Sequence, residues 1–216
     1  MSKRGYFIVF EGGEGAGKSI QVEILSSHLR EDKFPFVVTR EPGGTRIGEQ
    51  IRAITHNQDN VDLDPVTEAY LMAASRAQHV RETILPALTA GKIVICDRYV
   101  DSSIAYQGFG RQLGSAAISR LNILAVNGAV PDLTILLDVV PKSGLRRRRH
   151  DRGTKDRLDL QDAAFYERVY DGYRRISHGK NGKYVIIDAS RNIEQVATAV
   201  WEIVRPKIRL LKKGAV

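Results

Sequence analysis

The 216-residue chain has only one cysteine, Cys96. A single thiol excludes a disulfide within the chain and a zinc site built from several cysteines. Cys96 lies in the apolar run 93–96, which reads as a buried strand. A small core side chain is therefore the favoured interpretation of Cys96, and a reactive thiol is the alternative.

The sequence also lacks an apolar run long enough to cross a membrane. Its first residues, Met1-Ser2-Lys3-Arg4, lead directly into a strand-like run and do not resemble a secretory signal. There is no internal repeat, low-complexity linker or shift in composition that would mark a second domain. We therefore expect a single domain over residues 1–216, located in the cytoplasm and without a membrane partner.

Positive charge is in excess, with 33 Lys and Arg against 25 Asp and Glu. Much of it lies in the arginine-rich segment 146–157 and in the tail 207–213. Such an excess is typical of nucleic-acid binding, or of a small enzyme that handles polyanionic nucleotides. The tail is most simply a solvated helix end, with a binding element as the alternative.

The most informative motif is a phosphate-binding loop. A strand-like apolar run, 6–10, precedes it, and a helical pattern, 20–30, follows it, which is the context that the motif requires. Glycines let successive backbone N–H groups point at phosphate oxygens, the lysine reaches the outer phosphates, and the serine hydroxyl can bind Mg²⁺. The sequence therefore predicts a nucleoside triphosphate site with Mg²⁺. The loop residues are Gly12, Gly13, Glu14, Gly15, Ala16, Gly17, Lys18 and Ser19.

Short apolar strands alternate with helical patterns along the whole chain. The predicted strands are 6–10, 36–39, 93–96, 133–137 and 184–187, and the long helix 64–90 is expected to kink at Pro86. No helix is predicted for the polar and aromatic segment 99–114. This alternation predicts a doubly wound α/β fold, with a five-stranded parallel sheet and helices on both faces. In such sheets ligands bind beyond the carboxyl ends of the strands, where the polar sequences of this chain lie.

Asp97 and Arg98 directly follow the third predicted strand. In phosphate-loop enzymes a carboxylate at this place holds the Mg²⁺ shell or positions a nucleophile. The alternative is that Asp97 caps a helix or pairs with Arg98. Arg98 would lie close to the transferred phosphoryl group, where its fixed charge is useful.

The arginine-rich segment 146–157 allows three interpretations. It is an exposed basic helix end, a nucleic-acid patch, or a lid that closes over the triphosphate and supplies arginines to the developing charge. Its place between two helices, near the end of a phosphate-loop fold, favours a lid over about residues 146–159.

Five segments of the sequence resemble the thymidylate kinase family, a group of phosphate-loop nucleoside monophosphate kinases. The similarity runs from the first strand to Ala189. The segments are Arg40-Glu41-Pro42-Gly43-Gly44-Thr45 with Gly48, Glu49, Ile51 and Arg52; D-R-Y-V-D-S-S-I-A-Y-Q-G at 97–108; A-S-R-A-Q-H at 74–79; A-V-P-D-L-T at 129–134; and F-Y-E-R-V at 165–169.

The resemblance implies ATP-dependent phosphorylation of dTMP to dTDP with Mg²⁺, for dTTP synthesis, by a homodimer. It implies that Glu14 meets the 3′-hydroxyl of dTMP, that Arg76 binds the thymine edge with Ser103 or Gln107 close by, and that Tyr106 packs on the deoxyribose. The segment after Asp188 would contact adenine. The other implied contacts to dTMP come from Pro42 and from three arginines. These arginines, Arg40, Arg52 and Arg98, would lie near its phosphate.

Two details of the resemblance concern the lid and the base. Family members without an arginine in the phosphate loop carry catalytic arginines in the lid, and this loop has none. The resemblance therefore implies catalytic roles for Arg152 and Arg157, with Arg148 and Arg149 as rivals, beside Lys18, Asp97 and Arg98. Met72 stands where many members have a phenylalanine that stacks on thymine; a core-packing role is its alternative.

Three other functions remain open at this stage. One is a kinase for another nucleoside monophosphate or for a deoxynucleoside. Another is a nucleotide-dependent switch. The sequence argues against it, because the guanine-reading Asn/Thr-Lys-x-Asp motif is absent after the fourth strand. The last is a nucleic-acid-binding ATPase, which would bind through its basic clusters. We expect no nucleic-acid partner.

Overall fold

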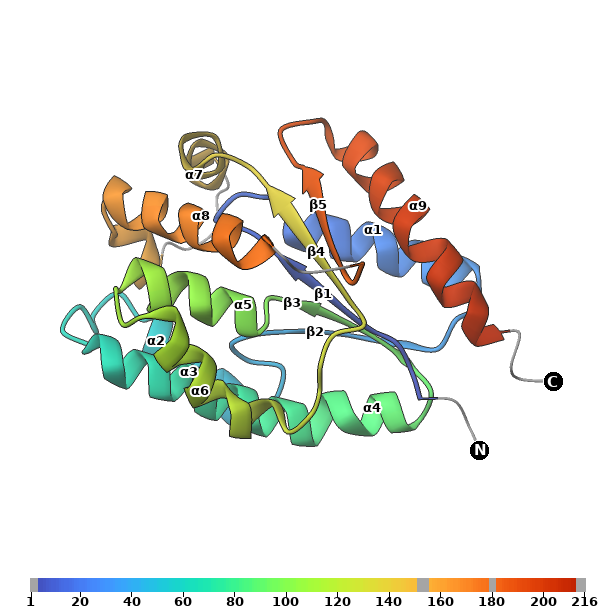
Figure 1. Ribbon diagram of the computed structural model, residues 1–216, viewed down its shortest axis with the longest axis horizontal. Helices are drawn as coiled ribbons and strands as arrows, with labels where there is room; N and C mark the ends of the chain where they lie inside the picture. The colour runs from blue at the N-terminus through green and yellow to red at the C-terminus, as the bar shows by residue number, and fades with distance from the viewer. Residues whose placement is uncertain (1–3, 151–155, 179–181, 213–216) are drawn as a thin grey trace.

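A parallel sheet forms the centre of the molecule (Figure 1). The computed structural model describes residues 4–150, 156–178 and 182–212. The five strands lie in the order β2-β3-β1-β4-β5, and every neighbouring pair is parallel. The predicted doubly wound α/β fold is therefore confirmed. The strands are β1 (Phe7–Glu11), β2 (Phe36–Arg40), β3 (Ile93–Asp97), β4 (Leu133–Asp138) and β5 (Tyr184–Asp188).

Each strand ends one residue later than its apolar run predicts, on a charged residue. Register explains the extension, because Arg40 pairs with Asp97 and Asp138 pairs with Asp188 at the carboxyl edge. Backbone pairing depends on the neighbouring strand and continues past the last apolar side chain. The polar ends of the strands are thus held on rigid backbone along one edge of the sheet.

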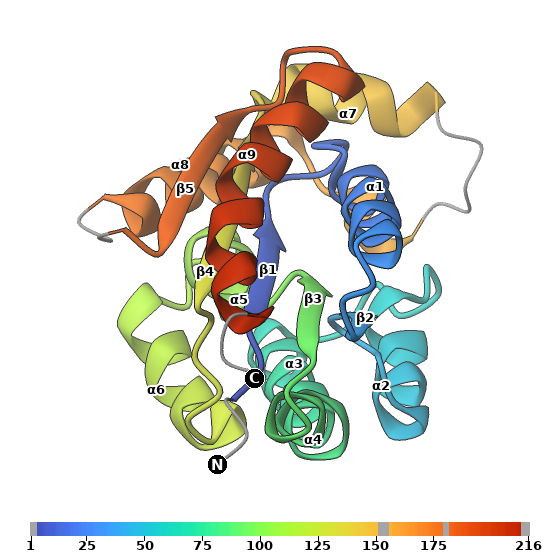
Figure 2. The same ribbon diagram turned by 90° about the vertical axis from the view of Figure 1, so that its right-hand side faces the viewer.

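Helices cover both faces of the sheet (Figure 2). Helices α1 (Lys18–Glu31) and α9 (Ile193–Lys212) pack on one face, where Leu25 and Val204 join a core with Phe10. The continuous helix α3 (Pro65–His79), η1 (Val80–Ile84) and α4 (Leu85–Thr89) packs on the other, through Ile84 and Leu88. Cys96 is fully buried in this second core, which confirms it as a core side chain.

A third apolar cluster joins helix α8 (Ala163–Ser177) to the segment after β3. That segment is helical, as α5 (Val100–Ser103) followed by the π-helix η2 (Ile104–Gly110), although the sequence predicted no helix there. The reason is a long-range cap: the Glu11 carboxylate of β1 accepts hydrogen bonds from the backbone N–H groups of Tyr99, at 2.9 Å, and Ser102, at 3.2 Å. Local sequence contains no such signal.

Two helices, α2 (Arg46–His56) and α3, begin at residues whose side chains cap them. Thr45 caps α2 and Asp64 caps α3, each through its side-chain oxygen. Where the sequence predicted a kink at Pro86, the π-helical turn η1 comes just before the proline, and α9 continues past Pro206 to Lys212. The other helices are α6 (Ser115–Val126), α7 (Pro141–His150) and the short 3₁₀-helix η3 (Arg157–Leu160).

A membrane-spanning helix is not found within the described ranges, because none of their helices combines the length and the apolar character that a span needs.

Candidate active site

A cavity of about 1400 Å³ opens at the carboxyl edge of the sheet. Its walls come from the phosphate loop, from the ends of β2 and β3, from η2, from α7 and from the start of α9. Most of the residues that the sequence singled out line it, but Gly12, Gly13 and Arg157 do not. The residues predicted from the sequence that do line the cavity are Glu14, Gly15, Ala16, Gly17, Lys18, Ser19, Arg40, Pro42, Arg52, Met72, Arg76, Asp97, Arg98, Ser103, Tyr106 and Gln107.

The phosphate loop holds Lys18 tightly in place. Gly15 and Gly17 have φ angles of 66° and 87°, in the left-handed region that glycine adopts without strain. A Cβ at Gly15 would also lie only 2.0 Å from the carbonyl oxygen of Gly144 in α7, so glycine lets the loop and α7 meet. Lys18 Nζ donates to the carbonyl oxygens of Gly12 at 3.1 Å and Gly13 at 2.9 Å. Burial, together with the charge of Arg98, lowers the pKa of Lys18 to about 8.

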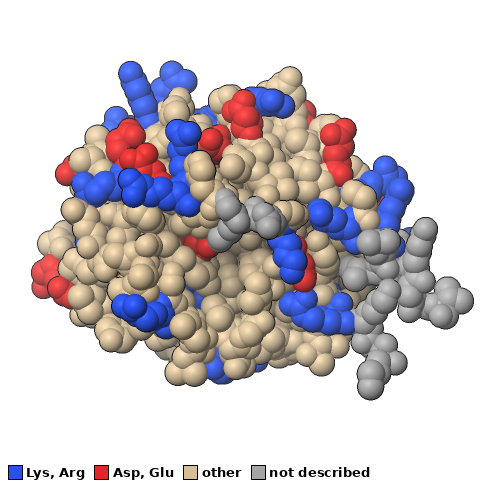
Figure 3. All heavy atoms as spheres, viewed as in Figure 1, with Lys and Arg blue, Asp and Glu red and all other residues tan. Residues whose placement is uncertain are grey.

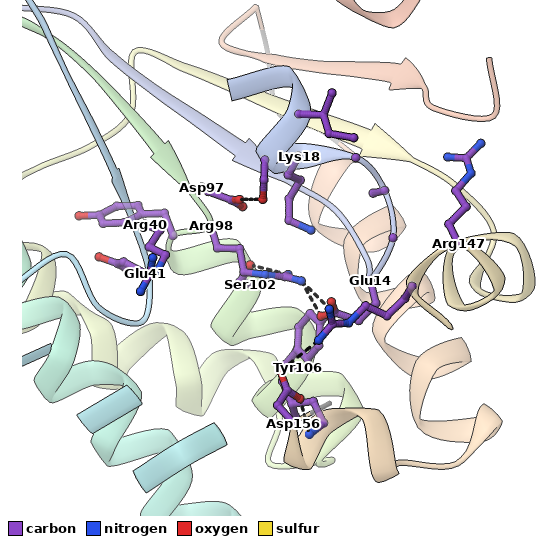
Figure 4. A pocket seen from close by; sticks show the side chains of 18 of the residues that line it. Glu14, Lys18, Arg40, Glu41, Asp97, Arg98, Ser102, Tyr106, Arg147 and Asp156 are labelled. Carbon is purple, nitrogen blue, oxygen red and sulfur yellow. Dashed lines mark hydrogen bonds and ion pairs between the residues drawn. The ribbon is translucent and has the colours of Figure 1, made fainter. Parts of the chain in front are cut away.

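Asp97 lies near this lysine (Figure 4) and is hydrogen-bonded to Ser19. The Ser19 hydroxyl donates to Asp97 Oδ2 at 2.9 Å, while Oδ1 is buried and has no hydrogen-bond partner among the described residues. A hydroxyl and a carboxylate with a free oxygen suit Mg²⁺, which binds one or two carboxylates and completes its shell with phosphates and water. No cluster of three or more His, Cys, Asp or Glu in the described part of the chain offers another metal site.

Arg98 lies at the centre of the cavity and makes contacts on several sides. Its Nη2 donates to Glu14 Oε1 at 2.6 Å, and its Nη1 donates to the carbonyl oxygen of Gly12 at 3.0 Å. The guanidinium also lies over the ring of Tyr106, 5.0 Å from its centroid. Figure 4 shows Lys18 and Arg98 directed at the same part of the cavity. Two fixed cations therefore face one volume at the end of the phosphate loop.

Glu14 is the anion between these cations. Its Oε1 accepts from Arg98 and, at 2.8 Å, from the hydroxyl of Tyr106, whereas Oε2 has no partner among the described residues. Burial would raise the pKa of Glu14, but the charges of Arg98 and Lys18 outweigh it and lower the pKa to about 2. The carboxylate is therefore ionised throughout the physiological range.

The Glu14 pKa predicts an acid-dependent stability. The ionised carboxylate stabilises the fold fully above the unfolded pKa of about 4.3, by at most about 3 kcal/mol. That contribution is lost as the pH falls towards 2. Urea unfolding should therefore show Glu14→Gln less stable than wild type at pH 7, with about half of the gap gone at pH 3. The exposed Glu31→Gln should show no such trend, and a constant gap for Glu14→Gln would contradict the prediction.

Glu11 is a supporting residue that the sequence analysis did not single out. Besides capping α5, its carboxylate accepts from the Ser102 hydroxyl at 2.6 Å and from the Tyr173 hydroxyl at 3.0 Å. Glu11 is fully buried, and burial raises its pKa. These bonds hold the backbone turn on which Arg98 sits with a φ of 69°. The only signal in the sequence is a carboxylate at a strand end.

Arg76 is held from four directions at the far end of the cavity. It donates to Glu41 Oε2 at 2.6 Å, to Ser103 Oγ at 3.0 Å, to the Tyr99 carbonyl oxygen at 2.9 Å and to Asn122 Oδ1. A guanidinium has five N–H donors, so one remains, on Nη2, without an acceptor among the described residues. Arg76 thus lines the cavity and keeps a single N–H donor that the described residues do not use. Met72 also lines this end, which favours the ligand-facing interpretation of its side chain.

Arg40 and Arg52 are less central. Arg40 is half exposed and pairs with Glu49 at 2.8 Å, while Arg52 donates to the carbonyl oxygen of Pro42 at 3.2 Å. Beside Arg52, His56 lines the cavity too, and burial with the charges of Arg52 and Arg98 lowers its pKa to about 3. His56 is therefore a neutral side chain that the sequence analysis missed.

The lid predictions need one correction. Arg157 does not reach the phosphate loop: it is 3% exposed, donates to the carbonyl oxygen of Thr55 at 3.0 Å and pairs with Glu68. The reason is that η3 turns this side chain towards α2 and α3. Arg152 lies outside the described residues. Arg148, which the sequence named only as a rival, lines the cavity and pairs with Asp159 at 3.1 Å, whereas Arg149 is exposed.

Comparison with known proteins agrees with this geometry. The family model for thymidylate kinase matches residues 10–200. The chain is 48% identical to a thymidylate kinase of Geobacillus thermodenitrificans over 193 residues, which cover 89% of this chain and 86% of the relative. It is 43% identical to that of Geotalea uraniireducens, over 94% of this chain and 98% of the relative. The chain belongs to the thymidylate kinase family.

A solved structure supports the same assignment. The thymidylate kinase of Ehrlichia chaffeensis is 32% identical, with a TM-score of 0.76 over 94% of this chain and 99% of the other. The predicted phosphate-loop nucleoside monophosphate kinase fold and the predicted family are thereby confirmed. The chain is an ATP-dependent kinase that phosphorylates dTMP to dTDP, a step in the supply of DNA precursors.

Proposed function

We propose that the γ-phosphoryl group of ATP passes in line to the phosphate of dTMP in the space between Lys18 and Arg98. The observation that carries this proposal is the convergence of two cations, the buried Lys18 and the partly buried Arg98, on one volume at the end of the phosphate loop. Charge in a phosphoryl-transfer transition state spreads over three equatorial oxygens, so fixed cations that face them lower the barrier.

The donor triphosphate binds along the phosphate loop. The backbone N–H groups of residues 13–19 and the N-terminus of α1 supply donors and positive potential to its oxygens. Ser19 and Asp97 are the residues that would hold Mg²⁺, which neutralises negative charge on the phosphates when bound. Adenine would lie against the loop before α9, where Arg191 and Asn192 line the cavity.

The acceptor dTMP binds at the opposite end. Arg98, Arg40 and Arg52 face its phosphate, and Glu14 accepts from its 3′-hydroxyl through the free Oε2. The remaining N–H of Arg76 meets an acceptor on the thymine edge, close to Ser103 and Gln107. Tyr106, Met72 and Pro42 cover the sugar and the base.

The acceptor oxygen is already anionic, so no strong general base is needed. The rate enhancement then comes from positioning and charge neutralisation. Arg148 is a lid arginine that lines the cavity and would contribute charge there. Arg152 keeps the catalytic role that the resemblance implies. Arg157 has no catalytic role in this mechanism.

The location of the enzyme, its oligomeric state and the role of its basic side chains are also proposals. We assign the enzyme to the cytoplasm and to a homodimer, for which the exposed apolar side chains Val66 and Tyr70 of α3 offer a surface. We assign its basic side chains to nucleotide phosphates rather than to nucleic acid. On the face that Figure 3 shows, Lys and Arg form separate groups with Asp and Glu among them instead of one continuous patch, which favours this assignment.

The experiment is an acceptor panel. With ATP and Mg²⁺, coupled ADP release should be strong with dTMP, weaker with dUMP, which lacks the methyl group, and at least about 10²-fold lower with dCMP, dAMP and dGMP. A kinase that prefers dCMP or a purine monophosphate would keep the transfer mechanism and overturn the base-binding roles of Arg76 and Gln107. No release with any acceptor would overturn the proposed reaction centre.

A further inference from the structure

Glu68, near the start of α3, is a fully buried carboxylate with no place in the mechanism above. Its Oε1 accepts from Gln107 Nε2 at 2.6 Å. Its Oε2 accepts from Arg111 Nε at 3.2 Å and from Arg157 Nη2. A buried carboxylate is stable only with such charged and hydrogen-bonding partners. We call Glu68, Gln107, Arg111 and Arg157 the Glu68 cluster.

One arm of the Glu68 cluster ends at the nucleobase end of the cavity. Gln107 lines the cavity and is only 2% exposed. Its amide nitrogen is bound to Glu68, and an ionised carboxylate can only accept hydrogen bonds. Glu68 therefore prevents the amide from flipping, and the oxygen Oε1 is left without a partner among the described residues. A carbonyl oxygen here can accept from a ring N–H, such as N3–H of thymine, but not from N3 of cytosine.

The other arm ends at the phosphate end. Arg157 is bound to Glu68 and to the carbonyl oxygen of Thr55, so it fastens η3 to α3 and α2. Asp156 caps η3 in a reciprocal bond with Asp159. Asp159 in turn accepts from Arg148 at 3.1 Å, and Arg148 lines the cavity. A continuous series of bonds thus joins Glu68 to Arg148.

We propose that Glu68 is a positioning residue that holds both ends of the active site at once. One of its oxygens fixes the amide of Gln107 at the nucleobase end. The other fixes η3 through Arg157, and with it Arg148 at the phosphate end. This inference rests on the proposed functions of Gln107 and Arg148, and it gives Arg157 a role as an anchor.

Steady-state kinetics of Glu68→Gln test the proposal. The neutral amide can no longer hold Gln107 in one orientation or pair with Arg157, so KM for dTMP should rise and kcat should fall, each by about tenfold. Gln107→Leu should raise KM with kcat within about twofold, and Arg157→Met should lower kcat with KM within about twofold. In Glu68→Gln/Arg157→Met, kcat should be no lower than in the more impaired single variant, because both changes break one series of bonds.

Base discrimination provides a readout that a purely structural role would not move. In Glu68→Gln the released amide can turn its NH₂ group towards N3 of cytosine, so the preference for dTMP over dCMP should narrow by about tenfold. The matched control is Glu82→Gln, an exposed side chain outside the cavity, which should leave kcat, KM and the preference unchanged.

The results separate the possible failures. If Glu68→Gln changes only the folded fraction and the melting temperature, with kcat, KM and the base preference per folded enzyme unchanged, Glu68 is structural and the proposal is overturned. If Glu68→Gln yields no folded protein, Arg157→Lys carries the test, and an unchanged kcat in that variant overturns the η3 arm. A wild-type enzyme that fails the acceptor panel instead refutes the proposed function, before any variant is measured.

Discussion

Lys18→Ala should lower kcat with ATP and dTMP by about 10³-fold or more and leave the fold intact. We expect a large loss of activity because, in the proposed mechanism, Lys18 is one of two fixed cations that face the transferring phosphoryl group, and water replaces such a preorganised donor poorly. The fold is spared because Lys18 is charged in a buried place, where its main contacts are the carbonyl oxygens of Gly12 and Gly13. Removing a buried charge also removes its desolvation cost.

The lowered pKa of Lys18 also predicts how the stability of the fold depends on pH. Because burial lowers that pKa to about 8 in the folded state, the unfolded chain binds more protons between about pH 8 and 10.4. The cost of burying the charge is fully present below pH 8 and disappears as the pH rises to 10.4. Thermal unfolding should therefore show wild type gaining stability relative to Lys18→Ala over this range. The exposed Lys142→Ala should show neither effect, and near-normal kcat in Lys18→Ala would refute the role of Lys18.

Arg98→Ala should be the most damaging single change, because it affects both activity and stability. Turnover should fall by about 10³-fold or more, since the second fixed cation is lost. Glu14 would then be left with the hydroxyl of Tyr106 and the more distant charges of Lys18 and Arg148. Breaking a largely buried pair by removing one partner costs about 3 kcal/mol, measured as the free energy of unfolding in urea.

A second variant separates these two effects of Arg98. In Arg98→Ala/Glu14→Gln the uncompensated carboxylate is gone, so most of the lost stability should return while turnover stays low. Recovery of turnover together with stability would mean that Arg98 acts only through the fold. Arg4→Ala is the matched control, because Arg4 pairs with Asp132 at 2.8 Å in an exposed position. Its loss should cost less than about 1 kcal/mol and leave turnover unchanged.

Much of the site could be predicted from the sequence because its parts are local. The phosphate loop needs glycines, a lysine and a serine at fixed spacing, and Lys18 and Ser19 line the cavity as that spacing requires. Asp97 and Arg98 follow an apolar strand, and the rule for the carboxyl ends of parallel strands places them opposite the loop. The fold followed in the same way from five short apolar runs that alternate with helical patterns.

Other features could not be predicted because they depend on partners far away in the chain. The helical segment 100–110 needs the Glu11 carboxylate, which is about 90 residues away, and no local cap marks its start. Arg157 resembles any other arginine of the lid segment, and only the fold brings Glu68 and the carbonyl oxygen of Thr55 to it. We therefore propose an anchoring role for Arg157, one of the residues to which the resemblance gave a catalytic role.

The sequence by itself determined the class of fold, the phosphate loop and the family, because each depends on short-range pattern and on motifs in order. The tertiary structure alone decided which charged side chains line the cavity and which pair with one another away from it. Arg98 and Arg157 are both arginines paired with glutamate, yet Arg98 lines the cavity and Arg157 does not. Their difference arises from the direction in which each backbone turns its side chain, which composition and spacing do not encode.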